Sequence, residues 1–424
     1  MGATSRSFAV GLLVALATQM LPLRTGLPAT DAEVDQASLD VRSAGAVYKQ
    51  FAPLLDIRTA HESSPFPLVI SPGETGDASV TSIAEWVREN AEWLTEAFYR
   101  HGAVVFRGFN VTSARDFEII AECAVLPSTL FDGIYLGTSP RLPAVDGTRY
   151  IYTASEIPGW QHITAHLEMS FRSVGMPQKI LFWGETPNES EGGETPLVDF
   201  LQVWKEMRPE VAQRFVERGL RYNRQYFSDQ KGGRNSVFPF SHHPSFAKSW
   251  EKMFHTEEKA VAAKRAVEQG FEPTWLHGDA DMLRLSHSMN ATRVHPITGQ
   301  TFWGNHLGVI HASMWVDEFA AAFHRPNMSS RWRLRAASSY AYMKVWGAIT
   351  QAFLGHAGIG MQATHADGGR IADEDVAHVR QLIWRNSFVA KWQKGDIAFL
   401  DNNRIAHGRQ AFSGPRRVLV SWAE

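Results

Sequence analysis

A histidine and a glutamate stand two positions apart in the segment TAHLEMSF, residues 164–171. In an extended strand, side chains at positions i and i+2 point to the same face, so His166 and Glu168 would offer a neutral nitrogen and a carboxylate to one point. On a helix the same two groups would diverge by about 200°. An extended segment with the apolar Leu167 turned into the core therefore predicts part of a metal site.

Two ligands hold a metal poorly, and the C-terminal segment 395–424 supplies the best candidate for a third. An apolar run there ends in an Asp-Asn-Asn turn, and a short return segment carries His407. Two histidines and one carboxylate on one side of an iron leave three positions open, which suits Fe(II) enzymes that bind a co-substrate and oxygen at the same ion. His166, Glu168 and His407 are therefore the candidate ligands.

Two arginines, Arg416 and Arg417, begin the last apolar run of the chain. A guanidinium inside a barrel needs an anion, because an unpaired buried charge is costly, and its planar fork suits a carboxylate. A dicarboxylate that chelates iron at one end would fit such an arginine at the other, with the hydroxyl of Thr195 beside it. The simpler interpretation is that both arginines are surface charges and that Gly192-Gly193 is a plain turn.

Short apolar runs without regular strand–helix alternation dominate the chain from about residue 160. The predicted strands are 103–109, 179–185, 388–393, 396–401 and 417–423. The predicted helices are 82–102, 200–218, 256–269 and 372–384. Ser82 and Glu85 are the expected capping box of the first helix, and Gly102 is its expected stop. The pattern is typical of a mostly β fold with flanking helices, an antiparallel barrel or jelly roll.

The composition is that of a folded protein with a large core, since 44% of the 424 residues are hydrophobic. The formal net charge is −2, and the scattered lysines and arginines give no nucleic-acid footprint. The single cysteine, Cys123, excludes an intrachain disulfide and is interpreted as a small buried apolar residue.

The N-terminal segment combines a basic start, a short apolar run and no acidic residue over residues 1–30. The run is too short to span a membrane and fits a cleavable targeting peptide, for the secretory pathway or for an organelle such as a plastid or mitochondrion. The alternative is a plain extension on a cytoplasmic protein. Residues 31–75 then form a connecting arm, and residues 76–424 form one catalytic domain.

Five segments together resemble the TauD/TfdA family of Fe(II)/2-oxoglutarate-dependent dioxygenases, and more closely its clavaminate synthase-like branch. In chain order they are HGAVVFRGFNV (101–111), HLEMSF (166–171), KILFWGE with GGETPLVD (179–199), TFWGNH (301–306) and WQKGDIAFLDNNRIAHGRQAFSGPRRVLVSW (392–422). Each segment alone is unspecific, but their order and spacing agree with the family over most of residues 80–424.

The resemblance implies a double-stranded β-helix (jelly-roll, cupin-like) core and an iron site made of His166, Glu168 and His407. It also implies 2-oxoglutarate and O₂ as co-substrates, with the distal carboxylate of 2-oxoglutarate bound by Thr195 and an arginine.

Between the two arginines we expect Arg417 rather than Arg416, because in the family the arginine lies two residues before an apolar position of the last strand, here Leu419. TauD-type enzymes carry a sulfonate-binding arginine four residues further on, where this chain has Ser421. The resemblance therefore disfavours taurine-like sulfonates.

Halogenating relatives replace the acid of the His-x-acid pair by a small residue, and this chain keeps Glu168. The resemblance thus implies oxidation, by hydroxylation in the first place, of an unactivated C–H bond in a small amino-acid-like or carboxylic-acid substrate. Desaturation and cyclisation use the same site and stay open.

Weaker candidates and other classes complete the sequence-based picture. Trp303 and Asn305 are candidates for the substrate pocket, although packing explains them equally well. His162 is interpreted as a neighbour of the ligand strand or as plain core. A zinc hydrolase with the same three ligands and a non-catalytic jelly-roll binding module are the alternatives, although the chain has no His-Glu-x-x-His helix. We expect a small-molecule partner and no stable membrane span; the oligomeric state stays open.

Overall fold

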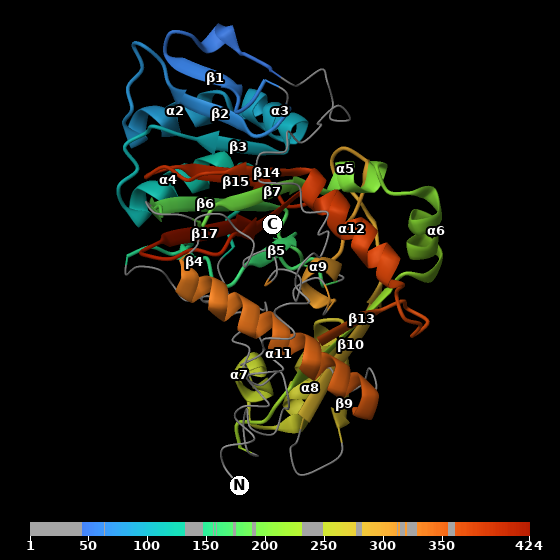
Figure 1. Ribbon diagram of the computed structural model, residues 1–424. Helices are drawn as coiled ribbons and strands as arrows, with labels where there is room; N and C mark the ends of the chain where they lie inside the picture. Colours follow the sequence, from blue (N-terminus) through green and yellow to red (C-terminus); the bar gives the residue numbers. More distant parts are fainter. Residues whose placement is uncertain are drawn as a thin grey trace.

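The computed structural model describes residues 45–424 apart from residues 63, 132–146, 156, 158, 173, 174, 189–191, 231–248, 277–281, 312, 314–318, 320–328 and 355–360. The described part is a mixed α/β structure in which several largely antiparallel sheets are flanked by helices (Figure 1). The expected targeting peptide over residues 1–30 lies outside the described residues. None of the described helices is both long and apolar enough to cross a membrane.

The largest sheet of the described chain has seven strands in the order β1-β2-β3-β15-β6-β17-β4. They are β1 (Leu55–Thr59), β2 (Leu68–Pro72), β3 (Ala103–Phe106), β15 (Ile397–Asp401), β6 (Lys179–Thr186), β17 (Arg417–Ala423) and β4 (Tyr152–Thr153). Neighbouring strands run antiparallel except β2 and β3, which are parallel. Four strands predicted from the sequence, β3, β15, β6 and β17, thus lie side by side in this sheet.

Two four-stranded sheets and a short strand pair make up the rest of the described β-structure. The second sheet has the order β14-β7-β16-β5, with β14 (Ser387–Ala390), β7 (Thr195–Asp199), β16 (Ile405–Arg409) and β5 (Ile163–His166). The third has the order β13-β8-β10-β9, with β13 (Met361–Thr364), β8 (Leu220–Tyr226), β10 (Met282–Met289) and β9 (Glu272–Leu276). The pair is β11 (Arg293–Val294) with β12 (Thr301–Phe302).

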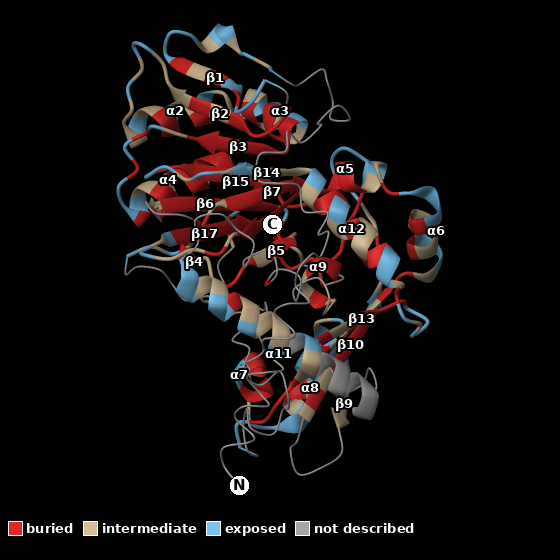
Figure 2. Cartoon of the chain, in the orientation of Figure 1, coloured by how far each residue is buried: buried red, intermediate tan, exposed pale blue. Residues whose placement is uncertain are grey.

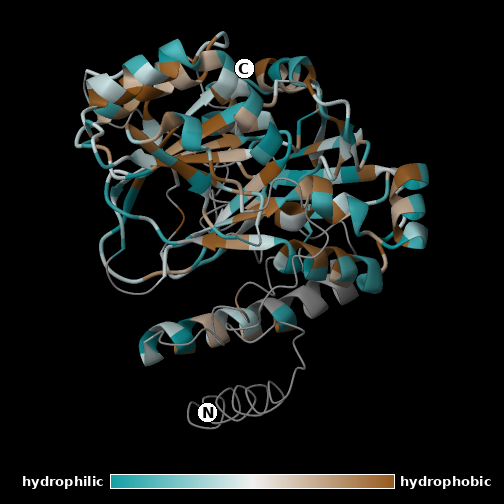
Figure 3. Ribbon diagram, turned by 90° about the horizontal axis from the view of Figure 1, so that it is seen from above, coloured by the Kyte–Doolittle hydropathy of each residue, from teal (hydrophilic) through white to brown (hydrophobic). Residues whose placement is uncertain are grey.

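Successive residues of β6 pack into two different cores, which explains its unbroken apolar run. Leu181 and Trp183 belong to the core beneath helices α2 (Val80–Glu89), α3 (Ala91–His101) and α4 (Ala114–Ala124), together with Cys123. Ile180 and Phe182 pack against residues of the second sheet. The central strands β7, β15 and β16 are buried along their whole length, and β6 along most of it (Figure 2). Hydrophobic residues gather on the strands in the interior, whereas the surrounding helices carry more polar residues (Figure 3).

The remaining helices surround the second and third sheets (Figure 1). They are α5 (Phe200–Lys205), α6 (Pro209–Arg218), α7 (Trp250–Phe254), α8 (Lys259–Glu268), α9 (Leu307–Ile310), α11 (Ser330–Leu354) and α12 (Asp373–Arg385), and a 3₁₀ turn, η1 (Lys49–Phe51), precedes β1. The helix predicted over 200–218 is two helices, because Pro209 begins α6 and holds Arg208 in an extended conformation.

The helix predicted over 82–102 is also divided, at Asn90, into α2 and α3. Its cap is Ser79 rather than Ser82: the side chain of Ser79 accepts from the backbone N–H of Ser82 at 3.2 Å. Gly102 ends α3 in the left-handed conformation, φ 73°, as predicted.

The segment 31–75, which was predicted to be a connecting arm, contains β1 and β2. These strands extend the largest sheet at one edge, where β2 pairs with β3. In β1 only Leu55, Ile57 and Thr59 are fully buried, and a five-residue half-buried edge strand leaves a weak sequence pattern. A domain boundary at residue 76 would therefore cut through a sheet.

Candidate metal centre

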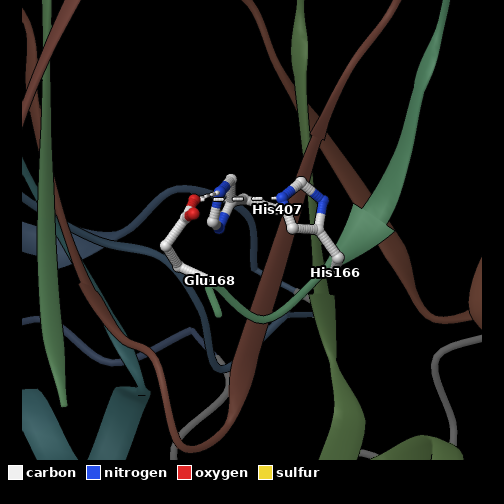
Figure 4. A group of neighbouring side chains, drawn as sticks. All are labelled: His166, Glu168 and His407. Carbon is white, nitrogen blue, oxygen red and sulfur yellow. Dashed lines mark ion pairs between the residues drawn. The ribbon is translucent and has the colours of Figure 1, made fainter. Parts of the chain in front are cut away.

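The three predicted metal ligands meet at one point, two of them from neighbouring strands and one from the turn that follows β5 (Figure 4). His166 ends β5, and His407 on β16 is its direct cross-strand partner. Glu168 Oε2 lies 3.9 Å from His166 Nε2 and 3.6 Å from His407 Nε2, and one ligand atom from each residue falls within 4.8 Å of the others. The ligand atoms are close to one another but too far apart to be hydrogen-bonded, so a metal ion could lie between them.

A backbone hydrogen bond sets the tautomer of His166. Its Nδ1 lies 2.8 Å from the carbonyl oxygen of Thr164, and because a carbonyl only accepts, Nδ1 carries the hydrogen. Nε2, the nitrogen nearer to Glu168, then keeps its lone pair for a metal. Two imidazoles and one carboxylate on one side of a pocket are the donor set that suits Fe(II) with open positions, so the residues present fit this ion.

Glu168 lies in a turn, not in a strand running through residues 164–171 as expected. β5 ends at His166, and Met169 adopts a left-handed φ of 57°. The side chain of Asn402 holds this turn: Oδ1 accepts from the N–H of Glu168 at 2.7 Å, and Nδ2 donates to the carbonyl of Glu168 at 3.0 Å. The carboxylate is therefore positioned by a side-chain clamp rather than by strand pairing.

Asn402 is fully buried in the Asp-Asn-Asn turn between β15 and β16. Its Nδ2 also donates to the carbonyl of Pro177 at 2.6 Å. The preceding Asp401 accepts from the backbone N–H of Asn403 at 3.0 Å and lies 2.7 Å from His295 Nε2. Sequence reasoning noted the turn but missed the clamp; the available signal was an asparagine just before the strand that carries His407.

The triad lines a pocket that also contains Thr195, the first residue of β7. The Thr195 hydroxyl oxygen accepts a hydrogen bond from Trp392 Nε1 at 2.7 Å. The hydroxyl hydrogen is then left to donate to a group in the pocket, which is the role predicted for Thr195.

Arg416, and not the preferred Arg417, lies on the pocket wall. Arg417 is exposed, and its Nη1 pairs with Glu185 at 2.9 Å. Successive residues of β17 alternate: Val418 lines the pocket, whereas Leu419 packs beneath the helices. The prediction placed the arginine two residues before Leu419, which gives Arg417. The residue of β17 that lines the pocket is Val418, and the arginine two residues before it is Arg416.

This correction moves the position compared with the sulfonate-binding arginine as well. Four residues after Arg416 stands Val420, and four after Arg417 stands Ser421, so neither count reaches an arginine. The expectation against taurine-like sulfonates stays a prediction.

The Gly192-Gly193 pair is more than a plain turn, because it lies against the segment that carries Arg416. Arg416 Nε donates to the carbonyl of Gly193 at 2.8 Å. A Cβ on Gly193, whose φ is 75°, would stand 2.7 Å from Arg416 Cδ, and one on Gly192 would stand 2.1 Å from the carbonyl oxygen of Ala411. Burial lowers the pKa of Arg416 to about 10.

A second arginine on the wall, Arg409, was not among the predicted residues. It is buried, and its guanidinium donates to the carbonyls of Ile157 at 2.9 Å and Gln161 at 3.0 Å. Burial, followed by the neighbouring charge of Arg416, lowers its pKa to about 9. The signal in the sequence was its position two residues after His407 on a strand.

Trp303 and Asn305, the predicted substrate-pocket residues, are not on this wall. Trp303 is buried in the core, with its ring centre 4.9 Å from that of Phe215. Asn305 Nδ2 donates to the carbonyl of Ala291 at 2.6 Å, and its Oδ1 accepts from the N–H of Leu307 at 2.9 Å at the start of α9. Both residues thus serve packing and local structure.

The wall instead includes His306, the residue that follows Asn305. Its ring centre lies 5.2 Å from that of His166, and its Nδ1 lies 2.9 Å from Ser170 Oγ. Burial, with the charge of His166 next, holds the pKa of His306 well below its usual value. His162 is buried but does not line the pocket, in agreement with its interpretation as core.

One protein-family match covers most of the chain. Residues 63–422 match the family described as taurine catabolism dioxygenase TauD, TfdA family. The dapdiamide synthesis protein DdaC of Enterobacter agglomerans is 28% identical over 347 residues, 82% of this chain and 89% of DdaC. A clavaminate synthase-like protein of Arabidopsis thaliana is 27% identical over 368 residues, 85% of this chain and 94% of that protein.

Among solved structures, PvcB, an Fe, α-ketoglutarate-dependent oxygenase from an isonitrile synthetic pathway, aligns over 88% of this chain and 92% of PvcB. The sequence identity is 11% and the TM-score 0.43. A taurine dioxygenase from Burkholderia xenovorans aligns over 88% of this chain and 90% of its own, with 13% identity and a TM-score of 0.40. The family match over residues 63–422 confirms the resemblance seen in the sequence: this chain belongs to the TauD/TfdA family of Fe(II)/2-oxoglutarate-dependent oxygenases.

Proposed function

We propose that this enzyme hydroxylates an unactivated C–H bond of a small amino-acid-like or carboxylic-acid substrate, with conversion of 2-oxoglutarate to succinate and CO₂. The observation that carries the proposal is the composition of one pocket. His166, Glu168 and His407 converge there, and Thr195 and Arg416 line the same wall. A metal-ligand triad beside an arginine and a hydroxyl suits a dicarboxylate that chelates the metal at one end.

Fe(II) held by His166, Glu168 and His407 would supply the oxidising chemistry, in which 2-oxoglutarate, O₂ and the substrate would give succinate, CO₂ and the hydroxylated substrate. His166 presents Nε2 because Thr164 holds its Nδ1 hydrogen. Asn402 fixes the turn from which Glu168 reaches the site. The protein's part is thus to hold three ligand atoms on one side and leave the other side open.

Arg416 and Thr195 would bind the distal carboxylate of 2-oxoglutarate. Arg416 Nε is engaged by Gly193, which leaves the Nη groups for a carboxylate. The Thr195 hydroxyl accepts from Trp392 and can donate to the same carboxylate. Apolar side chains, among them Phe182 and Val418, form much of the remaining wall and limit the access of water.

The first two sheets would be the two sheets of a double-stranded β-helix. The supporting observation is the core between them, where Phe182 and Val420 of the largest sheet meet Leu197 of the second. Because β1 and β2 extend the largest sheet, the catalytic domain would include them and begin before residue 76.

The substrate class rests on the family and on two sequence features. Glu168 is retained, which favours hydroxylation over halogenation, and no arginine stands four residues after Arg416. The relative named for dapdiamide synthesis supports a role in small-molecule metabolism, although an identity of 28% does not carry over its substrate.

The direct test is the visible charge-transfer band that a chelated 2-oxo acid gives with Fe(II). The protein is prepared without oxygen, Fe(II) is added, and 2-oxoglutarate is titrated into the parent, His166→Ala and, as a matched control, the non-lining His162→Ala. We expect the band in the parent and in His162→Ala, and no band in His166→Ala. A folded parent that binds Fe(II) and shows no band would contradict the proposed function.

A further inference from the structure

Within the described chain, one buried arginine near the pocket lacks the hydrogen bonds to carbonyl groups that fix the others. The residues of β8 alternate between buried and partly buried, and Arg224 occupies a buried position between Tyr222 and Tyr226. Its exposed fraction is 4%. An arginine on the inward face of a strand is unusual, because burying its charge requires compensation.

Three observations place Arg224 beside the pocket. Met361 on β13 is its cross-strand partner, so the two side chains share one face of the sheet, and Met361 lines the pocket. The guanidinium carbon of Arg224 lies 3.9 Å from the ring centre of Phe171, another lining residue. The ring of Phe171 is 5.4 Å from that of His306, which in turn is 5.2 Å from His166, so two aromatic rings separate Arg224 from the triad.

Two other arginines near the pocket, the partly buried Arg293 and the buried Arg409, are held by carbonyl groups. Arg293 Nε donates to the carbonyl of Gly304 at 2.9 Å, and its Nη2 donates to that of Ser170 at 3.1 Å. Arg409 has a similar arrangement. In contrast, Nη1 and Nη2 of Arg224 are both buried and have no hydrogen-bond partner among the described residues. The ring of Phe171 gives a cation–π contact but accepts no planar pair of hydrogen bonds.

We propose that Arg224 binds an anionic group, a carboxylate, of the substrate. This inference rests on the proposed function and names the residue that would recognise its substrate class. A carboxylate on the two Nη groups would satisfy them with two parallel hydrogen bonds. Arg416 on β17 takes the carboxylate of 2-oxoglutarate, whereas Arg224 on β8 takes that of the substrate. The apolar residues between Arg224 and the triad then contact the carbon chain to be oxidised.

The ligand test uses hexanoate as the probe and hexanamide as its neutral match. The protein is held without oxygen with Fe(II) and saturating 2-oxoglutarate, so that the Arg416 site is filled. Shifts of the charge-transfer band are titrated in the parent, Arg224→Met, Arg224→Lys and, as the control on the same strand, Arg221→Met, whose arginine pairs with Glu272 at 2.5 Å. The same ligands are added to metal-free protein, and the melting temperature is recorded.

Hexanoate, but not hexanamide, should shift the band and raise the melting temperature of the parent and of Arg221→Met. The apparent dissociation constant should rise at least about tenfold in Arg224→Met and less in Arg224→Lys, which keeps the charge but loses the planar fork. Equal responses in the parent and Arg224→Met, or no response of the parent to hexanoate, would overturn the inference. Absence of the band in the parent would instead contradict the proposed function, because the metal-free measurement still reports on Arg224.

A stability measurement separates a ligand-binding role from a structural one. Without ligand, Arg224→Met should melt at a higher temperature than the parent, because methionine removes a buried cation whose Nη groups lack hydrogen-bond partners among the described residues, and keeps much of the volume. Arg293→Met should melt at a lower temperature, because it leaves carbonyls unpaired. If Arg224→Met melts lower, or does not fold, Arg224 is structural and the inference is wrong.

Discussion

The pocket has two sides whose charged groups are held in different ways. On the side formed by β5, β7, β16 and β17, hydrogen bonds from the protein fix the functional groups: Thr164 orients His166, Asn402 holds the turn of Glu168, and Gly193 binds Arg416 Nε. On the side formed by β8 and β13, Arg224 is buried against Phe171 without such bonds in the described chain. We call these the cosubstrate side and the β8 side.

The difference follows from what each side would bind. Iron and 2-oxoglutarate are the same in every turnover and across the family, so a site for them gains from being fixed before they bind. A substrate-binding group gains from leaving its hydrogen bonds to the substrate, because donors already satisfied would have to be freed first. Arg416 and Arg224 illustrate the two cases within one pocket.

The largest effect on the cosubstrate side should come from Asn402→Ala. Loss of the clamp frees the turn that positions Glu168, and such changes behind a metal ligand typically cost about 10- to 100-fold in affinity or activity. The measurement is Fe(II) affinity together with succinate formation. Asn386→Ala, which removes an asparagine bonded to Glu206 and Leu382, is the matched control and should leave both unchanged. Equal Fe(II) affinity in the Asn402→Ala variant and the parent would show that the clamp does not position Glu168.

A smaller effect is expected from Gly193→Ala. Its Cβ would stand 2.7 Å from Arg416 Cδ and displace that side chain, so the KM for 2-oxoglutarate should rise by about tenfold. Gly299→Ala is the control, because Gly299 has a similar φ of 68° and open space around its Cβ. Both variants should lose similar backbone stability, and only Gly193→Ala should change KM. A matching rise in KM for Gly299→Ala would assign the effect to backbone strain.

Trp392→Phe should have a milder effect on the same side. The change removes the N–H that donates to Thr195 Oγ1, a net loss of about 1 kcal/mol, which corresponds to roughly fivefold weaker 2-oxoglutarate binding. Titration of the charge-transfer band measures it, with the neighbouring exposed Gln393→Ala as the control. If Trp392→Phe binds 2-oxoglutarate as the parent does, the orientation of Thr195 does not depend on this bond.

A pH-dependent effect on stability concerns the β8 side. Burial, and after it the charges of Arg224, Arg293 and Arg221, lower the pKa of His287 to about 4, against a weaker opposing effect of Glu272. A histidine takes up its proton near pH 6.5 when unfolded, so between pH 6.5 and 4 the unfolded state binds more protons and stability falls as the pH falls. The loss attributable to His287 is at most about 3 kcal/mol.

Urea unfolding at several pH values measures this dependence. His287→Gln should largely remove the decline in the free energy of unfolding between pH 6.5 and 4. Arg224→Met should make this decline shallower, because it removes one of the positive charges that lower the pKa of His287. Equal slopes in the parent and His287→Gln would contradict the assignment.

The two sides also differ in how many of their residues could be predicted from the sequence. Four predicted residues line the pocket: His166, Glu168, His407 and Thr195. They could be predicted because short sequence motifs on neighbouring strands, and in the turn after β5, carry them. The sequence favoured Arg417, whereas Arg416 and Val418 line the pocket, because one residue changes the face of a strand. The role of Arg416 is therefore a proposal that the lining of the pocket supports.

The β8 side was not predicted, for reasons of distance along the chain. Arg224, Phe171 and Met361 come from three separate segments, and only pairing of β8 with β13 brings the first and last together. Trp303 and Asn305 stood in a motif next to the lining residue His306, but their own side chains turn to the core and to the cap of α9. Spacing within a motif does not show which of its residues faces a pocket when the segment is not a regular strand.

The most direct test compares the two adjacent arginines of the cosubstrate side. 2-Oxoglutarate is titrated without oxygen into Fe(II)-loaded parent, Arg416→Gln and Arg417→Gln, and its dissociation constant is read from the charge-transfer band. We expect Arg416→Gln to bind at least about thirtyfold more weakly, because the charge pair with the distal carboxylate is lost, and Arg417→Gln to bind as the parent does. Weaker binding in Arg417→Gln with unchanged binding in Arg416→Gln would contradict the assignment of the cosubstrate side.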